Sequence, residues 1–204
     1  IGNYIDRIAN NRMLEKSSWN EIYPETEDAF RNREDDMNYP KNGKWRGEFW
    51  GRYILSAIAC SEYYNSYSIK ERVKQAVEGV LSTQDENGYI GTYQHSDFLI
   101  GDNWNLWCRK YTLWGLIQAM DFLQDESMLP SIKSFADRII SETGPDTIDI
   151  IKTGNFYGMA STSLLYPMIK LFKVTGDEKY LSYAEYIVDQ WSEHPEGLPD
   201  ILHK

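Results

Sequence analysis

The chain has 204 residues, enough for one domain or for part of a larger one, and 42% of them are hydrophobic. A formal net charge of −10 repels phosphate groups, so nucleic acids and acidic membrane surfaces are not expected partners. No run reaches the roughly 18 to 20 apolar residues of a membrane-spanning helix, so we expect a soluble protein. Its compartment stays open between periplasm, exterior and cytoplasm, and its oligomeric state is also open.

The first 44 residues, 1–44, are predicted to be a mostly irregular segment. Ile5, Ile8 and Leu14 have helical spacing and indicate a first helix or the end of one. From Ser17 to Lys44 the chain is polar and interrupted by Pro and Gly, which leaves room for one short helix. We expect this segment to lie on the surface.

Three pairs of helices are predicted between residues 45 and 194. In each pair a strongly apolar helix precedes one with a polar face, and the expected ranges are 45–64 and 68–83, 104–123 and 128–141, and 160–174 and 178–191. Ser68 followed by Glu71 has the spacing of a capping box and predicts the start of the second helix.

These pairs repeat along the chain. The second helices align at an offset of 59 residues, which matches Val73, Val77, Val80 and Leu81 with Ile132, Ala136, Ile139 and Ile140. The first helices align at an offset of 58, which matches Tyr53 and Leu55 with Tyr111 and Leu113. Long loops at one end of every hairpin suit an α/α toroid, in which an inner ring of helices is wrapped by an outer ring. We therefore predict a single all-α domain over residues 1–204, with the first helix of each pair inside. Three pairs make half of an (α/α)6 barrel, which favours a truncated chain over a half-length relative.

Three motifs in order resemble successive landmarks of one enzyme family, the β-L-arabinofuranosidases of glycoside hydrolase family 127. They are Gly47-Glu48-Phe49-Trp50-Gly51-Arg52, the stretch from Gln84 to Tyr93, and the stretch from Leu171 to Leu181. The resemblance implies an (α/α)6 catalytic barrel, of which this chain is the N-terminal half. It also implies action on terminal sugars of plant or other complex glycans.

The resemblance is incomplete at the sugar pocket. The family's inner-helix positions that match Cys108 and Ser161 commonly carry histidines, and both are absent here. The resemblance also implies that the family's metal-binding cysteine and glutamate cluster lies beyond Lys204, so we assign no zinc ligand, nucleophile or cofactor to this chain. The scattered histidines argue against a metal triad within it. Cys60 and Cys108 lie in apolar helical patterns, as buried thiols or, alternatively, as a disulfide.

Glycosidases typically need two carboxyl groups across the scissile bond. Glu48, Asp97 and Asp102 are the candidates, because they lie in the loops and helix ends expected on the cleft side. Each also has a structural alternative: Glu48 can act on the helix dipole alone, Asp102 can cap the following helix, and Asp97 can simply be solvated.

Aromatic rings near the same ends are candidates for stacking on sugars. The candidate substrate-binding residues are Trp45, Tyr93, Trp104, Trp107 and Tyr157. For Trp107, as for Trp50, a core role is the favoured alternative. Arg109 and Lys110 complete the set, since two cations in the first turns of an inner helix require an anion. That anion is a structural partner among Glu48, Asp97 and Asp102, or an acidic sugar.

Together these features predict a glycoside hydrolase with an oligosaccharide or glycan as its partner. Two alternatives remain. One is a hydrolase of unsaturated or acidic uronyl sugars that uses Arg109 and Lys110, and the other is a non-catalytic glycan-binding protein, favoured by the missing histidines.

Overall fold

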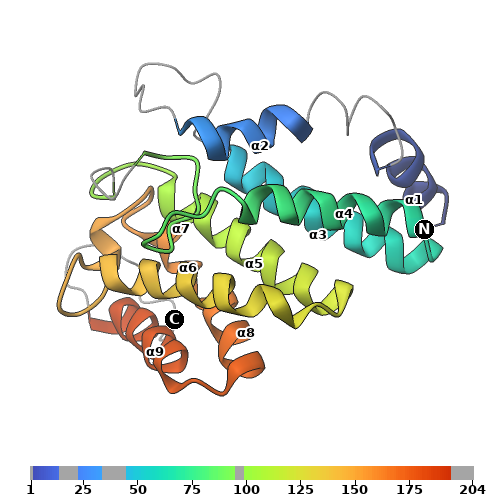
Figure 1. The fold of residues 1–204 in the computed structure, drawn as a ribbon. Helices are drawn as coiled ribbons and strands as arrows, with labels where there is room; N and C mark the ends of the chain where they lie inside the picture. Colours follow the sequence, from blue (N-terminus) through green and yellow to red (C-terminus); the bar gives the residue numbers. More distant parts are fainter. Residues whose placement is uncertain (1, 14–22, 34–44, 95–98, 194–204) are drawn as a thin grey trace.

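The computed structural model describes residues 2–13, 23–33, 45–94 and 99–193 (Figure 1). Within these ranges the regular structure is helical, and extended pairing is limited to isolated bridges such as the one between Ile100 and Thr153. None of the described helices combines the length and the apolar character that crossing a bilayer requires.

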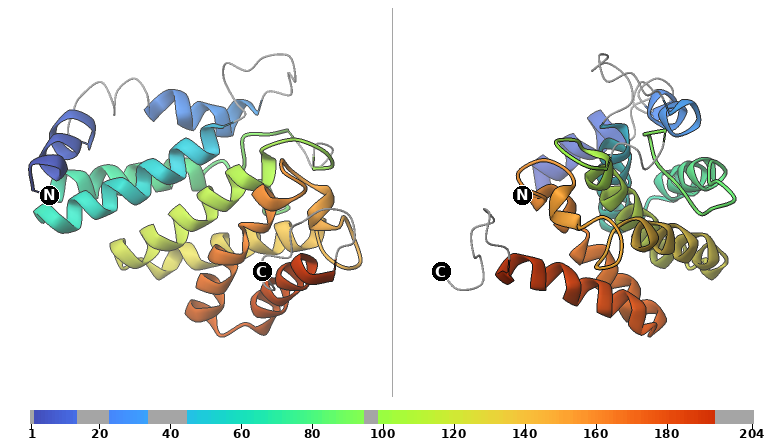
Figure 2. Two further views of the ribbon diagram at one scale, coloured as in Figure 1. Left: turned by 180° about the vertical axis from the view of Figure 1, so that it is seen from behind. Right: turned by 90° about the vertical axis from the view of Figure 1, so that its left-hand side faces the viewer.

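Three helix pairs form the body of the structure. Their first members are α3 (Arg46–Tyr64), α5 (Asn105–Leu123) and the combination of α7 (Met159–Thr162) with α8 (Leu165–Thr175); their second members are α4 (Tyr67–Leu81), α6 (Leu129–Glu142) and α9 (Glu178–Glu193). Short 3-10 turns, Glu126–Met128 and Ile150–Lys152, precede α6 and α7. From behind, α3 and α5 lie side by side in front of α4 and α6 (Figure 2).

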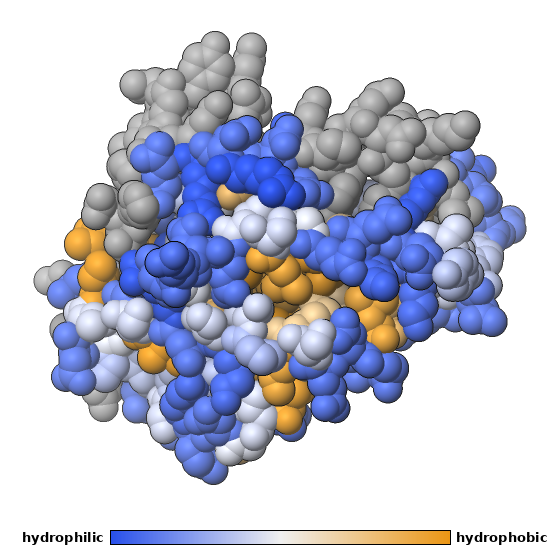
Figure 3. Space-filling view, in the orientation of Figure 1, coloured by the Kyte–Doolittle hydropathy of each residue, from blue (hydrophilic) through white to orange (hydrophobic). Residues whose placement is uncertain are grey.

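The first helix of each pair is an inner helix. α5 packs against α3 on one side and against α7 and α8 on the other, and α4 and α6 also contact it. Most of its circumference is therefore buried. The second helices bury one stripe only, which in α4 consists of Ile69, Val73, Ala76, Val77 and Val80. Figure 3 shows the face formed by α4, α6 and α9, which is largely hydrophilic with an apolar strip between α4 and α6.

The repeat between the first two pairs has a single offset. α3 and α5 are both 19 residues long, and their first and last residues are 59 positions apart. Each is followed by a cap residue in the left-handed conformation, Asn65 or Gln124. The offset of 58 predicted for the first helices is thus wrong by one residue, because it matched residue types and not positions along the helix.

Glycines allow α3 and α5 to approach closely. A Cβ atom on Gly51 would lie 2.5 Å from the carbonyl carbon of Tyr111, and one on Gly115 would lie 3.0 Å from the Trp50 ring. Gly47 likewise faces the Cβ atom of Cys108 at 3.0 Å. The crossing of the two inner helices therefore depends on positions without side chains.

The described parts of the N-terminal segment contain the helices for which the prediction left room. These parts contain α1 (Gly2–Ile8), a π-helical turn (Ala9–Met13) and α2 (Tyr23–Asn32). α2 packs on α3, and its fully buried Phe30 meets the Trp50 ring edge-on at a centroid distance of 6.0 Å. Only a narrow stripe of this helix is apolar, and it is the one short helix for which the polar sequence left room.

The third pair also differs from the prediction. The single helix expected over 160–174 is broken into α7 and α8 by a turn at Ser163 and Leu164. Pro167 lies in the first turn of α8 and has no N–H group to donate to the carbonyl of Ser163. A continuous helix would therefore lack a hydrogen bond there.

Helix α4 begins two residues earlier than the capping-box pattern indicated. Its cap is Ser66, whose hydroxyl accepts a hydrogen bond from the Ile69 amide, while Ser68 lies inside the first turn. We expect Ser66→Ala to lower the free energy of unfolding by about 1 kcal/mol and Ser68→Ala to change it by a few tenths. Urea denaturation followed by circular dichroism would measure both, and a larger effect of Ser68→Ala would contradict the assignment.

Candidate functional site

The N-terminal ends of α3, α5 and α7 lie at the same end of the molecule, on the left in Figure 1. The loops that lead into α5 and α7 are joined by hydrogen bonds. The Gly101 amide donates to the Lys152 carbonyl at 2.9 Å, and the Asn155 side chain donates to the Asn103 carbonyl at 2.9 Å. Residues from three separate pairs are therefore brought together at this end.

A continuous row of aromatic rings runs from these loops along α5. We call it the aromatic face; its six residues are Phe156, Trp104, Trp107, Tyr111, Trp114 and Tyr166. Successive ring centroids are 4.6 to 6.0 Å apart along the row. The four residues of α5 and its cap are half-buried and recur at helical spacing, whereas Phe156 and Tyr166 at the two ends are exposed. The rings form a surface that is partly open to solvent.

Two cations lie against the middle of the aromatic face. The Lys110 ammonium nitrogen is 4.0 Å from the centroid of the Trp107 ring and 3.2 Å from that of Tyr111. The Arg52 guanidinium carbon lies 4.7 Å from the Tyr111 centroid, and this group also pairs with the Glu48 carboxylate at 2.8 Å. α3 and α5 thus both contribute charged groups to the aromatic surface.

The environment of Lys110 disfavours its positive charge. Lys110 is only 5% exposed, and this burial, followed by the positive charge of Arg52, lowers the pKa of its ammonium group to about 8. The negative charge of Glu48 acts in the opposite direction and is the weaker influence. An additional anion at this position would stabilise the charged form.

Cys108 and Ser161, the two positions at which the resemblance implies histidines in the family, are both buried. Cys108 is buried beside Gly47, and burial raises the pKa of its thiol to about 12, although backbone hydrogen bonds from Glu48 and Gly47 oppose the shift. Ser161 is fully buried beside Gly154, and its hydroxyl donates to the Thr153 carbonyl at 3.1 Å. Both small side chains are packed against neighbouring backbone, so neither position presents a functional group to the aromatic face.

Two of the three predicted carboxylates, Glu48 and Asp102, lie within the described residues. Glu48 lies in the first turn of α3 beside Arg52 and has 18% of its side chain exposed. Asp102 is exposed, and the expectation that it caps α5 is wrong, because the Asn103 side chain accepts the hydrogen bond from the Asn105 amide at 2.9 Å. Asp97 lies outside the described residues. Glu48 is thus linked to the aromatic face through its ion pair with Arg52, which lies over the Tyr111 ring.

Arg109 points away from the aromatic face into the interior. It is fully buried and forms an ion pair with Glu142 of α6, which is also bound by Arg138 at 2.7 Å. The ring of Tyr89 lies 4.4 Å from its guanidinium carbon. Its structural partner is therefore Glu142, and the expectation of Glu48, Asp97 or Asp102 in this role is wrong.

The remaining predicted aromatic residues have different environments. Trp45, the cap residue of α3, is 52% exposed, and Tyr157 is 72% exposed beside Phe156. Tyr93 is buried, and its carbonyl accepts a hydrogen bond from the Tyr89 hydroxyl at 2.5 Å. Trp50 is fully buried in the core, which confirms the core role favoured for it.

Sequence reasoning did not select Arg52, Tyr111, Trp114, Phe156 or Tyr166 as site residues. The signal for two of them was available, since residues 104, 107, 111 and 114 are all aromatic at spacings of three and four. Arg52 and Tyr166 join them only because α3 and α8 flank α5.

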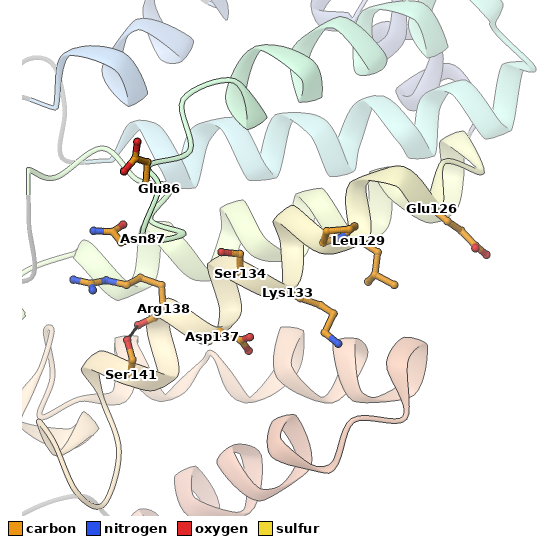
Figure 4. Close-up of a pocket in the computed structure, with 10 residues that line it drawn as sticks. Glu86, Asn87, Glu126, Leu129, Lys133, Ser134, Asp137, Arg138 and Ser141 are labelled. Carbon is orange, nitrogen blue, oxygen red and sulfur yellow. Dashed lines mark hydrogen bonds between the residues drawn. The ribbon is translucent and has the colours of Figure 1, made fainter.

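A separate hollow of about 820 Å³ lies on the outer surface. It is lined by α6 and the loop that precedes α5, and Figure 4 shows Lys133, Asp137 and Arg138 along one side and Glu86 and Asn87 above. No aromatic side chain lines it. Several of its charged groups already have partners in the protein, such as Lys133 with Asp177 at 3.5 Å. We therefore place the candidate site at the aromatic face and not in this hollow.

The described residues offer no obvious metal site. Among them, no group of three or more His, Cys, Asp and Glu side chains is placed to hold a metal ion. Cys60 and Cys108 are both buried and free, so the prediction of buried thiols is confirmed and the alternative of a disulfide is wrong.

Comparison with solved structures identifies the fold. The β-L-arabinofuranosidase of family GH127 from Geobacillus stearothermophilus T6 superimposes with a TM-score of 0.72 at 19% identity, over 95% of this chain and 32% of that one. A second GH127 β-arabinofuranosidase superimposes with a TM-score of 0.63 at 16% identity, over 90% and 30% of the two chains. The chain thus spans about a third of the length of these relatives. A search of curated proteins finds no match.

The helix pairs and their arrangement define part of an α/α toroid, which confirms the predicted fold class. The family model described as the β-L-arabinofuranosidase GH127 catalytic domain matches residues 1–198. The chain belongs to this family, as its three sequence motifs indicated.

Proposed function

We propose that the chain forms part of a glycoside hydrolase that releases terminal sugars from complex glycans of the plant type. The aromatic face carries this proposal. Six rings in contact, open to solvent and flanked by charged groups, match the need of a sugar for apolar stacking together with hydrogen bonds to its hydroxyls. Membership of the GH127 family and the likeness to β-arabinofuranosidases support the same function.

In this proposal the helix ends supply both the stacking surface and polar groups. Trp104 and Trp107 stack on the sugar, with exposed Trp45 and Tyr157 at the margin. Glu48 is one acidic candidate for a hydrogen bond to the substrate or for a catalytic role, and Asp97 and Asp102 are the other candidates for the second carboxyl group.

A tryptophan substitution tests the role of the aromatic face. We expect Trp104→Ala in the natural protein to raise KM for a β-L-arabinofuranoside roughly tenfold, because a stacking contact contributes about 1 kcal/mol or more. Trp191→Ala is the matched control, since Trp191 is also half-buried but lies in α9. The control should change KM less than twofold, and both variants should keep the helical circular dichroism spectrum. Equal KM values in the two variants would contradict the proposed role of the face.

A non-catalytic glycan-binding protein is the second candidate. It is favoured by the buried Cys108 and Ser161, which stand where relatives commonly carry pocket histidines. Calorimetric binding of an arabinoside without any release of sugar by the natural protein would select it over the hydrolase.

A further inference from the structure

The Lys110 ammonium group has no direct ion pair in the part of the chain that the structure describes, and the Glu48 carboxylate acts on it only from a distance. Its ammonium group contacts the rings of Trp107 and Tyr111, and the described residues give it no hydrogen bond or ion pair. A buried ammonium group is costly without a paired anion, and contact with a ring replaces only part of the lost hydration. The site therefore favours binding of an additional negative charge.

Arg52 adds a second cation on the same surface. Its guanidinium group and the Lys110 ammonium group both lie against the Tyr111 ring, at 4.7 and 3.2 Å from the centroid. The one neighbouring carboxylate among the described contacts of Arg52 is Glu48. Two positive charges and one negative charge leave a net charge of about +1 beside the rings. Burial is the main cause of the lowered pKa of Lys110, and the positive charge of Arg52 lowers this pKa further.

The surroundings of this charge suit a sugar. Trp107 and Tyr111 provide ring faces, on which the apolar face of a sugar ring can stack. In a stacked sugar the ring substituents project sideways, so a carboxylate on the ring could extend towards the two cations that lie over the Tyr111 ring. Arg52 is suited to this role, because its planar guanidinium group can bind a carboxylate through two parallel hydrogen bonds.

We propose that Lys110 and Arg52 form a subsite that binds the carboxylate of a uronyl sugar while its ring stacks on Trp107 and Tyr111. This inference rests on the proposed sugar-binding function of the aromatic face and narrows its ligand to an acidic sugar. It assigns the carboxylate to a different pair of residues than the sequence suggested. Arg109 is already paired with Glu142 in the interior, so Arg52 of α3 acts together with Lys110.

Paired sugars that differ only in the carboxylate test this subsite. We expect the natural protein to bind methyl β-D-galacturonide at least tenfold more tightly than methyl β-D-galactoside by calorimetry at low salt, and 0.5 M NaCl to reduce the difference. Lys110→Met should abolish this preference, whereas Lys110→Arg should retain it. Equal affinity for the two sugars in the unchanged protein would overturn the inference.

Lys170→Met is the matched control. The Lys170 ammonium nitrogen also lies over a ring of the aromatic face, 5.6 Å from the Tyr166 centroid, but far along the row from Arg52. This variant should keep the preference for the acidic sugar, and its loss would overturn the assignment to Lys110. If Lys110→Met fails to fold, Arg52→Gln provides the same test and should reduce the preference at least threefold.

The same experiments separate this inference from the proposed function. Release of a neutral arabinoside without any preference for the acidic sugar would overturn the subsite and leave the glycosidase proposal intact. The absence of binding and release for every sugar would overturn both, because no ligand would then occupy the aromatic face.

Discussion

Gly51→Ala is expected to destabilise the protein by about 3 kcal/mol, although alanine favours a helix over glycine. The added methyl group would lie 2.5 Å from the carbonyl carbon of Tyr111 and 2.8 Å from its Cβ atom. These atoms belong to the backbone of α5 and the base of its side chain, so they cannot move without separating the two inner helices. Thermal and urea unfolding followed at 222 nm would measure the loss.

Gly79→Ala is the matched control for this prediction. Gly79 also lies within a helix, but a Cβ atom there would meet the end of the Glu27 side chain, which can rotate away. The gain in helix propensity is about 1 kcal/mol, so the net change should be close to zero or slightly stabilising. Similar destabilisation by both substitutions would show that the crossing of α3 and α5 is less tightly packed than the distances indicate.

Glu142→Ala is expected to lower the free energy of unfolding by about 3 to 5 kcal/mol. Arg109 is fully buried, and its strongest anionic partner would be lost while its charge remained in the interior. Arg138 would lose the same partner. Chemical denaturation would measure the effect, which should far exceed the change of less than about 1 kcal/mol expected for Glu78→Gln in the exposed Lys74–Glu78 pair.

A double variant separates the loss of an attraction from the burial of an unpaired charge. Arg109→Met combined with Glu142→Leu should recover much of the stability lost in Glu142→Ala, since two apolar side chains replace both charged groups. If the double variant is as unstable as the single one, then packing around these positions, and not the unpaired charge, sets the stability.

The network around Arg109 also connects the candidate site to the outer ring. Arg109 lies between Cys108 and Lys110 in the sequence of α5. It forms an ion pair with Glu142 of α6, and its guanidinium group stacks on Tyr89 of the preceding loop. On one side of this turn of α5, Arg109 is bound in the interior. On the other side, Lys110 contacts the aromatic face. Adjacent cations therefore have separate roles, one in stability and one in the proposed binding of an anion.

Local patterns in the sequence are sufficient to predict the helix pairs, their inner and outer order and the family. The helix pairs follow from local periodicity, since the apolar stripe of the second helices recurs after 59 residues. The family follows from the three motifs, which occur in order along the chain. Even the rings of Trp104, Trp107, Tyr111 and Trp114 could be placed on one side of a helix by their spacing. Local errors arose at helix ends, where Ser66 and not Ser68 is the cap and where Pro167 accompanies a break.

Contacts between residues of different helices could be found only from the packing of those helices. The partner of Arg109 is 33 residues away in α6, and Arg52 reaches Tyr111 because glycines allow α3 and α5 to cross closely. Periodicity shows which side of each helix is apolar, but not the distance and angle at which two helices pack. Those two quantities decide which partners Arg109 and Lys110 meet on their two sides of α5, bury Cys108 and Ser161, and bring together a candidate site from residues of three different helix pairs.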